Sequence, residues 1–165
     1  MNLKIRTASE PDWPQIIAIY NQAVDQGACT ADTEHVTVAS RRNWLQLHTA
    51  SRYPILIAEL DGAMAGWCSI SPYRPGRKAL EKTAEISYYV DRDYRERGIA
   101  RFLMEQAINR AKAAGHRNLI AILLDINTPS LNLLEKFGFD RWGHLPGIAD
   151  FGAIHCGHYL YGRKI

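Results

Sequence analysis

The chain has little net charge, few cysteines and no long apolar segment, and each absence excludes a class of protein. Its 165 residues carry 20 Lys+Arg and 17 Asp+Glu, a formal net charge of +3, with 47% hydrophobic residues. A chain this apolar and this nearly neutral is not a disordered acidic or basic tail. Three cysteines without a Cys-x-x-Cys pair indicate a reducing compartment rather than a disulfide scaffold.

Membrane and export signals are also missing from the sequence. No apolar run approaches the roughly 20 residues of a membrane span. The N-terminal Met-Asn-Leu-Lys-Ile-Arg-Thr lacks the apolar region of a signal peptide. No repeat, low-complexity stretch or long linker divides the chain. We therefore expect a cytoplasmic protein with no membrane partner, folded as a single domain over residues 1–165.

The basic residues are dispersed, and their densest group alternates with acidic residues. That group is Asp91, Arg92, Asp93, Arg95, Glu96, Arg97 and Arg101. A face that binds duplex nucleic acid is more often a stripe of uncompensated positive charge. The pattern therefore favours a small anionic ligand, and we expect no nucleic-acid partner.

Periodicity and turn residues predict an α/β fold, a mixed sheet of six to seven strands flanked by helices on both faces. The first predicted helix begins at residue 13 and ends at Gly27, and the other helices cover 38–50, 99–114 and 128–137. The pair Asp61-Gly62 predicts a β-hairpin. A glycine-rich loop is expected between the last two strands. The predicted strands cover residues 3–6, 55–60, 63–71, 83–90, 119–124, 139–144 and 154–161.

The junction between strand 83–90 and helix 99–114 predicts an anion-binding site. Small residues at Gly98 and Ala100 allow a ligand to approach the backbone closely. The unpaired N–H groups and the dipole of a helix start favour a phosphate there. The segment matches neither the Rossmann nor the P-loop glycine pattern. The alternative interpretation is an ordinary strand-to-helix turn that needs a glycine for steric reasons.

The segment Arg95-Glu96-Arg97-Gly98-Ile99-Ala100 resembles the Arg/Gln-x-x-Gly-x-Gly/Ala pyrophosphate loop of the GCN5-related N-acetyltransferase (GNAT) superfamily. The downstream motif from Asn127 to Phe139 is also similar to that superfamily. Within it, several short motifs resemble the phosphinothricin and methionine sulfoximine acetyltransferase branch, over about residues 5–152. These motifs are Ile19-Tyr20-Asn21, Tyr53-Pro54-Ile55, Pro72-Tyr73-Arg74-Pro75 and Thr83-Ala84-Glu85-Ile86-Ser87-Tyr88-Tyr89-Val90.

The resemblance implies an enzyme that transfers an acetyl group from acetyl-CoA to the amine of a small amino-acid-like acceptor, without a metal. Phosphinothricin, methionine sulfoximine and methionine sulfone are the implied acceptors, and members often form homodimers. For Asn127 and Ser130, a plain helix cap is an equally good local interpretation. The cofactor-binding residues implied are Tyr88, Tyr89, Val90, Arg95, Glu96, Arg97, Gly98, Ile99, Ala100, Arg101, Asn127 and Ser130.

Glu85 is the candidate catalytic base. Amino groups titrate near pH 8 to 10, roughly, so much of an amine substrate is protonated at neutral pH and a base is useful. Strand alternation places Glu85 on the same face as Ser87 and Tyr89. Glu85 also matches the glutamate of the branch. The alternative interpretation is an exposed edge-strand carboxylate paired with Lys82 or an arginine.

Arg74 matches the substrate-binding arginine of the branch, and its planar guanidinium suits an acceptor carboxylate. Tyr73 beside it is the other implied substrate-binding residue, and Arg77 is a weaker candidate. The alternative for Arg74 is a solvated loop arginine. His155 and His158 do not predict a metal site, since residues three apart on a strand point to opposite faces.

Two departures from the branch leave parts of the mechanism open. Leu134 occupies a position where relatives carry Tyr or His, and leucine has no proton to give the departing thiolate. Water or another residue supplies that proton, or the thiolate departs without one. The segment 147–152 and its continuation to Ile154 also differ, so its contact with substrate is undecided. Acetylation of peptide N-termini and a non-catalytic acyl-CoA-binding module are the competing functions.

Overall fold

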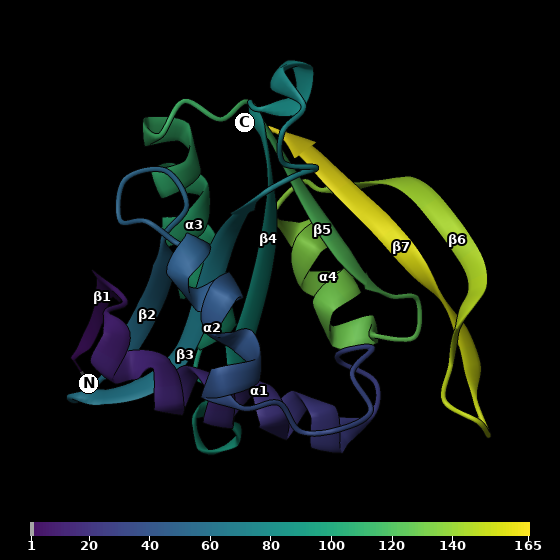
Figure 1. Cartoon of the computed structure of the whole chain (residues 1–165), viewed down its shortest axis with the longest axis horizontal. Helices are drawn as coiled ribbons and strands as arrows, with labels where there is room; N and C mark the ends of the chain where they lie inside the picture. Colours follow the sequence, from purple (N-terminus) through teal and green to yellow (C-terminus); the bar gives the residue numbers. More distant parts are fainter. Residues whose placement is uncertain (1) are drawn as a thin grey trace.

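Seven strands form one mixed sheet in the computed structural model, which describes residues 2–165 (Figure 1). The strand order is β1-β2-β3-β4-β5-β7-β6. Every neighbouring pair is antiparallel except β4 and β5, which run parallel. The strands are β1 (Leu3–Thr7), β2 (Ile55–Leu60), β3 (Ala63–Pro72), β4 (Thr83–Val90), β5 (Asn118–Leu124), β6 (Asp140–Asp150) and β7 (His155–Lys164).

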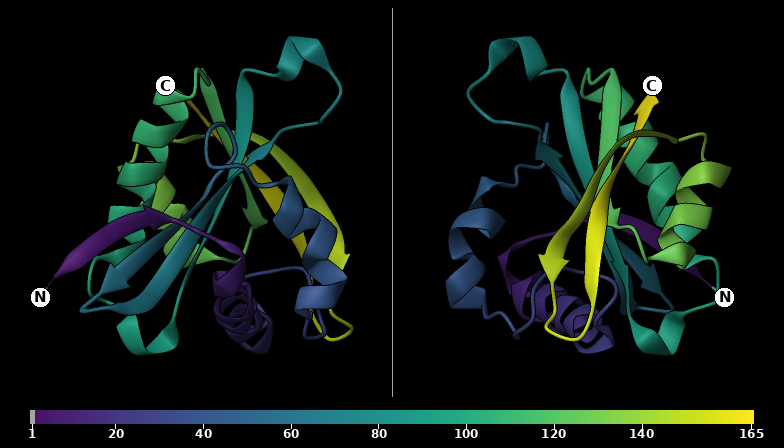
Figure 2. Two further views of the ribbon diagram at one scale, coloured as in Figure 1. Left: turned by 60° about the vertical axis from the view of Figure 1, so that its left-hand side comes forward. Right: turned by 90° about the vertical axis from the view of Figure 1, so that its right-hand side faces the viewer.

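Four helices cover the two faces of the sheet (Figure 2). The helices are α1 (Trp13–Gln26), α2 (Val38–Leu47), α3 (Ile99–Ala113) and α4 (Thr128–Lys136). On one face, Ile16 and Leu45 of α1 and α2 pack with Trp67 of β3. On the other, Leu103 of α3 and Leu134 of α4 join the larger core cluster. The predicted mixed α/β sheet with helices on both faces is confirmed.

Local sequence explains the hairpin between β2 and β3. Asp61 and Gly62 both have positive φ, 51° and 89°. Two consecutive positive φ angles are the signature of a type I′ turn, whose twist matches that of the flanking strands. The hairpin predicted from Asp61-Gly62 is therefore confirmed.

The two inner strands β4 and β5 pair over only part of their length. The parallel register joins Thr83–Asn118, Ala84–Leu119 and Glu85–Ile120 and then stops. Beyond Glu85, β4 stays paired with β3 as far as Val90. β5 stays paired with β7 as far as Leu124. The two strands therefore diverge within the middle of the sheet.

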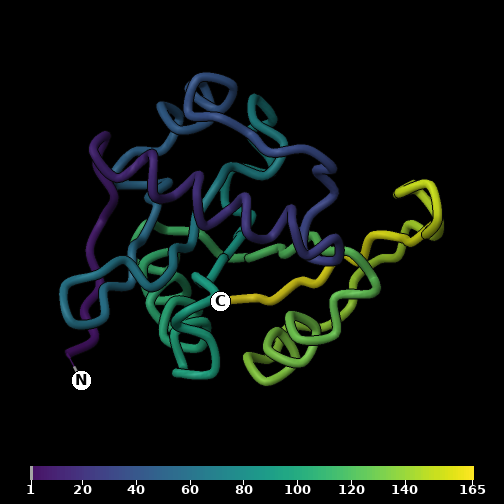
Figure 3. Tube along the Cα trace, turned by 90° about the horizontal axis from the view of Figure 1, so that it is seen from below, coloured from purple at the N-terminus to yellow at the C-terminus, as the bar shows by residue number. Residues whose placement is uncertain are grey.

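The C-terminal hairpin is longer than the sequence predicts. The expected glycine-rich loop after residue 144 is wrong over most of its length, because β6 continues to Asp150. An irregularity in register between Leu145 and Ala149 absorbs Pro146 and Gly147. β6 is an edge strand, where a proline removes no ladder hydrogen bond. Figure 3 shows the hairpin of β6 and β7 projecting from the body of the protein.

Helix α2 also ends earlier than predicted, at Leu47 rather than at residue 50. Its last turn is closed by His48, whose backbone N–H donates to the Leu45 carbonyl oxygen. The His48 backbone is extended, which stops the helix at that residue.

Within residues 2–165, no helix combines the length and the apolar character that crossing a membrane requires.

Gly66 of β3 lies close against β4 and the start of α3. A Cβ added there would lie 2.7 Å from the Tyr89 carbonyl oxygen. Because backbone would have to move, we expect Gly66→Ala to lower the free energy of unfolding by about 1–3 kcal/mol in urea denaturation. Gly143→Ala is the matched control, since its added Cβ meets only Leu160 side-chain atoms at 3.8 Å. Equal losses in the two variants would contradict the close approach at Gly66.

Candidate functional site

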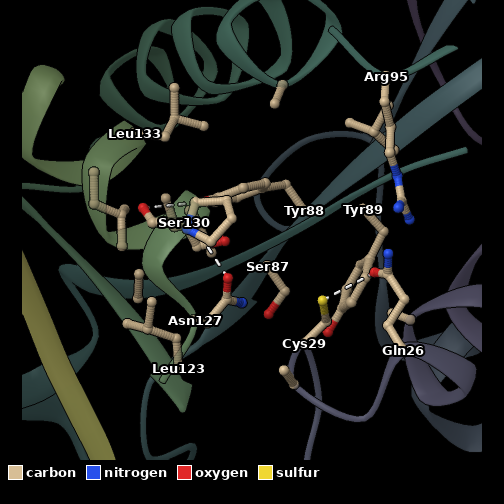
Figure 4. Close-up of a pocket in the computed structure, with 18 of the residues that line it drawn as sticks. Gln26, Cys29, Ser87, Tyr88, Tyr89, Arg95, Leu123, Asn127, Ser130 and Leu133 are labelled. Carbon is tan, nitrogen blue, oxygen red and sulfur yellow. Dashed lines mark hydrogen bonds between the residues drawn. The ribbon is translucent and has the colours of Figure 1, made fainter. Parts of the chain in front are cut away.

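The divergence of β4 and β5 opens a cleft of about 630 Å³ (Figure 4). Ser87 to Val90 of β4 form one wall, and residues 121–123 of β5 form the opposite wall. Asn127, Ser130 and Leu133 close one end, and Gln26 and Cys29 face them across the opening.

Cys29 was not predicted, since nothing in its local sequence connects it with β4. Burial raises the pKa of the Cys29 thiol, which keeps it protonated.

The segment that joins β4 to α3 presents backbone N–H groups beside this cleft. Glu96 and Gly98 have positive φ, 60° and 78°, and Gly98 is the N-cap of α3. The first-turn N–H groups of a helix have no partner within the helix. Those of Ile99, Ala100 and Arg101 therefore have no partner within the helix, and their binding of an anion stays a prediction. The Arg95, Arg97 and Arg101 side chains around them are exposed.

Asp91 and Gln22 hold this segment in place, and sequence reasoning missed their roles. The buried Asp91 carboxylate accepts hydrogen bonds from Gln22 Nε2 at 3.0 Å and from the Asp93 N–H at 2.9 Å. The Gln22 side-chain oxygen in turn accepts from the Arg92 N–H at 2.8 Å. An aspartate at the first position of a turn is a local signal for the Asp93 bond. The contact with α1 joins residues 69 positions apart, and no local signal gives it.

Asn127 both caps α4 and lines the cleft. Its Oδ1 accepts a hydrogen bond from the Ser130 N–H at 3.3 Å, so the helix-cap interpretation is confirmed. Because Oδ1 is the capping atom, the amide NH₂ of Asn127 is left over as a donor. Tyr88 closes the same corner by donating from its hydroxyl to the Ser130 carbonyl oxygen at 3.4 Å. Burial raises the pKa of Tyr88 to about 12.

A smaller cleft of about 160 Å³ lies on the α1 and α2 side of β4. Tyr20, Arg41, Trp44 and Trp67 are among its lining residues. Sequence reasoning missed this cleft, because its aromatic residues have the spacing of ordinary core positions. Ser87 and Tyr89 line both clefts and form the wall that they share.

The charges at the mouth of the smaller cleft are balanced. Asp32 Oδ2 accepts hydrogen bonds from Arg41 Nη2 and from the Tyr20 hydroxyl, the latter at 2.5 Å. The Arg41 guanidinium also lies 5.9 Å from the centre of the Tyr20 ring. Most lining residues of the smaller cleft are aromatic or apolar, and the charge of Arg41 is neutralised by Asp32.

Glu85 lies where β4 and β5 begin to diverge. It is half-buried, and burial raises the pKa of its carboxyl group above 4.5. β4 is an inner strand, so the edge-strand interpretation of Glu85 is wrong. Among residues 2–165, no Lys, Arg or His side chain forms an ion pair with it. Glu85 lines neither cleft, but it shares the face of Ser87, two residues along the strand.

The predicted substrate residues lie further away. Tyr73 is half-buried and its N–H donates to the Thr83 carbonyl oxygen at 3.4 Å. Arg74 is exposed in the loop after β3 with a φ of 54°. Neither lines either cleft. Leu134 is 1% exposed and belongs to the core against the larger cleft.

A sheet divided at its one parallel pair, with the start of a helix beside the split, is the arrangement of the acyl-CoA-dependent N-acetyltransferases. Residues 13–139 match the model of the acetyltransferase (GNAT) family. The chain belongs to this family.

Three similar proteins narrow the resemblance. The chain is 38% identical over 164 residues to the Bacillus subtilis (strain 168) protein named "Putative phosphinothricin acetyltransferase YwnH", with 99% of each chain covered. It is 33% identical to an L-methionine sulfoximine/L-methionine sulfone acetyltransferase of Pseudomonas aeruginosa (strain PAO1), covering 90% of this chain and 86% of that one. A crystal structure of a phosphinothricin acetyltransferase from Sinorhizobium meliloti in complex with AcCoA matches with a TM-score of 0.92 and 25% identity, over 100% and 89% of the two chains.

The chain is therefore an N-acetyltransferase, and acetyl-CoA is its acetyl donor. The residues that line the larger cleft fit acetyl-CoA. The open helix start at Gly98 offers unpaired N–H donors to a pyrophosphate, and the β4 edge from Ser87 to Val90 is free of β5.

Asp91→Ala tests whether the Asp91–Gln22 contact orients the helix start. Loss of hydrogen bonds to a buried carboxylate costs about 1–3 kcal/mol. We expect the Kd of acetyl-CoA, measured by calorimetry, to rise about tenfold. Asp93→Ala is the control, because that side chain is exposed on the same turn. Unchanged affinity in Asp91→Ala, with the fold intact, would show that the contact serves stability alone.

Proposed function

We propose that this N-acetyltransferase acetylates the α-amino group of a small amino-acid-like acceptor, such as methionine sulfoximine, methionine sulfone or phosphinothricin. The observation that carries the proposal is the wall of Ser87 and Tyr89 between two clefts. One cleft has the size and donors for acetyl-CoA, and the other has room for the side chain of one amino acid. The names of the similar proteins support the same acceptor class.

On the donor side, backbone groups make most of the proposed contacts. When bound, acetyl-CoA supplies an acetyl thioester that an amine can attack. The N–H groups of the segment from Arg95 to Arg101 would hold its pyrophosphate, with the surrounding arginines as counter-charges. The exposed edge of β4 at Tyr88, Tyr89 and Val90 would pair with the pantetheine amides. The Asn127 NH₂ and the Ser130 end of α4 would contact the same arm. The segment consists of Arg95, Glu96, Arg97, Gly98, Ile99, Ala100 and Arg101.

On the acceptor side, Glu85 acts as the base. Its carboxyl group is half-buried, has no ion-pair partner among the described residues and faces the same side of β4 as the smaller cleft. A carboxyl group with a raised pKa takes a proton more readily than an ordinary glutamate. Glu85 would remove the proton from the acceptor ammonium, directly or through one water molecule.

The side chain and the carboxylate of the acceptor also need partners on the protein. Its side chain would lie against Trp44 and Tyr89 in the smaller cleft, where the Arg41–Asp32 pair balances the charge. Tyr73 and Arg74 would take its carboxylate only after movement of their loop, since both lie outside the clefts. Leu134 has no proton to donate, so the thiolate departs unprotonated or is protonated by water or another group.

The whole chain, residues 1–165, would act as one acetyltransferase domain, because β7 completes the sheet beside β5.

A homodimer stays a prediction. Four apolar side chains of the projecting hairpin are exposed, and a second copy could cover them; light scattering after size exclusion measures this. They are Trp142, Leu145, Ile148 and Ile154, exposed by 48%, 47%, 57% and 56%.

A panel of acceptors tests the proposal. Protein and acetyl-CoA are mixed with methionine sulfoximine, methionine sulfone, phosphinothricin, the free amino acids and peptides with free N-termini, and CoA release is followed. We expect turnover on at least one small amino-acid-like acceptor and at least tenfold lower kcat/KM on peptides. Turnover on peptides alone would favour N-terminal acetylation, and tight CoA binding without turnover would favour a non-catalytic binding module.

Paired arginine variants test the predicted contact with the acceptor carboxylate. We expect Arg74→Ala to raise the acceptor KM about tenfold, the loss that one charge-assisted contact gives, with kcat retained. Arg77→Ala, exposed in the same loop, tests the weaker candidate and should raise the KM less than Arg74→Ala does. A wild-type KM in Arg74→Ala would exclude Arg74 from the acceptor site.

Glu85→Gln tests the base. We expect kcat to fall about 10²- to 10⁴-fold, the usual contribution of a positioned base, with the Kd of acetyl-CoA unchanged. Because the raised pKa of Glu85 lets it hold its proton to higher pH, wild-type activity should rise with pH through a value above 4.5. Glu85→Gln should lose that acidic limb. Glu81→Gln, an exposed neighbour, is the control and should keep the wild-type kcat. A wild-type kcat in Glu85→Gln would exclude Glu85 as the base.

A further inference from the structure

A row of three polar side chains crosses from α2 to the candidate base. Ser71 of β3 stands directly opposite Glu85 of β4 in the antiparallel register. Opposite residues of such a pair project from the same face, with Cβ atoms about 4.5–5.5 Å apart. His48, at the end of α2, completes the row with its Nε2 3.0 Å from the Ser71 Oγ. Figure 1 shows α2 lying against the β3 and β4 side of the sheet.

The contacts of His48 fix the position of its proton. Its Nδ1 lies 2.8 Å from the Trp44 carbonyl oxygen. A carbonyl oxygen can only accept, so Nδ1 carries the hydrogen. In the neutral imidazole, Nε2 is then an acceptor, and it takes the hydrogen bond of the Ser71 hydroxyl. The Ser71 proton is therefore directed toward His48.

This direction has a consequence for Glu85. A serine hydroxyl has one proton and two lone pairs. With the proton directed at His48, the Ser71 oxygen turns only lone pairs to its other neighbours. It cannot donate a hydrogen bond to the carboxylate across the strand pair. Burial alone accounts for the raised pKa of Glu85, with no hydrogen bond among the described residues lowering it.

We propose that His48, acting through Ser71, is a positioning residue that keeps the Glu85 carboxylate free of a hydrogen-bond donor and so available to the acceptor amine. The inference rests on the proposed role of Glu85. If His48 did not hold the Ser71 proton, the hydroxyl could rotate and donate to the carboxylate. That bond would stabilise the charged form of Glu85 and make it a weaker base.

The surroundings of His48 keep it neutral. On α2, the Trp44 ring lies 4.3 Å from the His48 ring, between centroids. On β3 its polar neighbour is Ser71, and the nearest charged residue along this row is Glu85 of β4, opposite Ser71. Burial lowers the pKa of His48, the Trp44 carbonyl opposes this, and no charged group contributes. At neutral pH the acceptor form of Nε2 therefore predominates.

Three variants test the inference: His48→Phe, Ser71→Ala and the double variant. Phenylalanine keeps a ring against Trp44 but accepts no hydrogen bond. The readouts are the carboxyl ¹³C chemical shift of Glu85 against pH and the acidic limb of kcat/KM. In His48→Phe we expect both to move to lower pH by about one unit, the effect of one hydrogen bond to a charged group.

The double variant separates positioning from packing. Because His48 acts only through the Ser71 hydroxyl, adding His48→Phe to Ser71→Ala should move neither readout further. A purely structural His48 would produce the same change with or without Ser71, and that result would overturn the inference. An unshifted titration of Glu85 in His48→Phe would also overturn the inference. His35→Phe, an exposed histidine bonded to Asp25, is the control and should leave both readouts unchanged.

The two proposals fail in distinguishable ways. The chemical-shift titration needs no turnover, so it reports on His48 even if no acceptor in the panel is acetylated. Absence of turnover with an intact His48 effect would contradict the proposed function alone. Normal turnover with no His48 effect would contradict the positioning role alone. Thermal unfolding and the Kd of acetyl-CoA should stay near wild type in every folded variant.

Discussion

The site depends on one interrupted interaction, the pairing of β4 with β5. Three residue pairs hold the two strands together, and the ladder then ends at Glu85 and Ile120. Each strand keeps its other neighbour, so the sheet remains continuous while its centre opens. The open edge of β4 exposes backbone groups that a sheet would otherwise satisfy internally. Such groups need partners, which supports the proposed binding of a ligand rich in amides in this gap.

Local sequence was sufficient for much of the fold and for the position of the helix start at Gly98. Asp61-Gly62, the apolar run of β5 and the glycine at position 98 each specify their conformation over a few residues. β6 was mispredicted because Pro146-Gly147 resembles a turn, and only its place at the sheet edge makes a strand compatible with both. The point where β4 leaves β5 is a property of three strands together, and no short stretch of sequence contains it.

The same division between local and distant information applies to the site. Gly98 and Asn127 were recognisable from their own neighbourhoods. The Gln22–Asp91 contact and the smaller cleft were not, because their residues are brought together from distant positions of the chain. Periodicity is informative only within a window of about 11–18 residues. Ser71 and His48 have ordinary local patterns and acquire significance only from the register that sets Ser71 against Glu85.

The wall formed by Ser87 and Tyr89 has a consequence for the order of chemical events. It separates two clefts that both border α1, and burial keeps the Cys29 thiol beside the larger cleft protonated. If no side chain carries the acyl group, the enzyme has to hold both substrates at once. Its initial-rate plots should then intersect, as for a sequential reaction, and neither product is released before both substrates have bound.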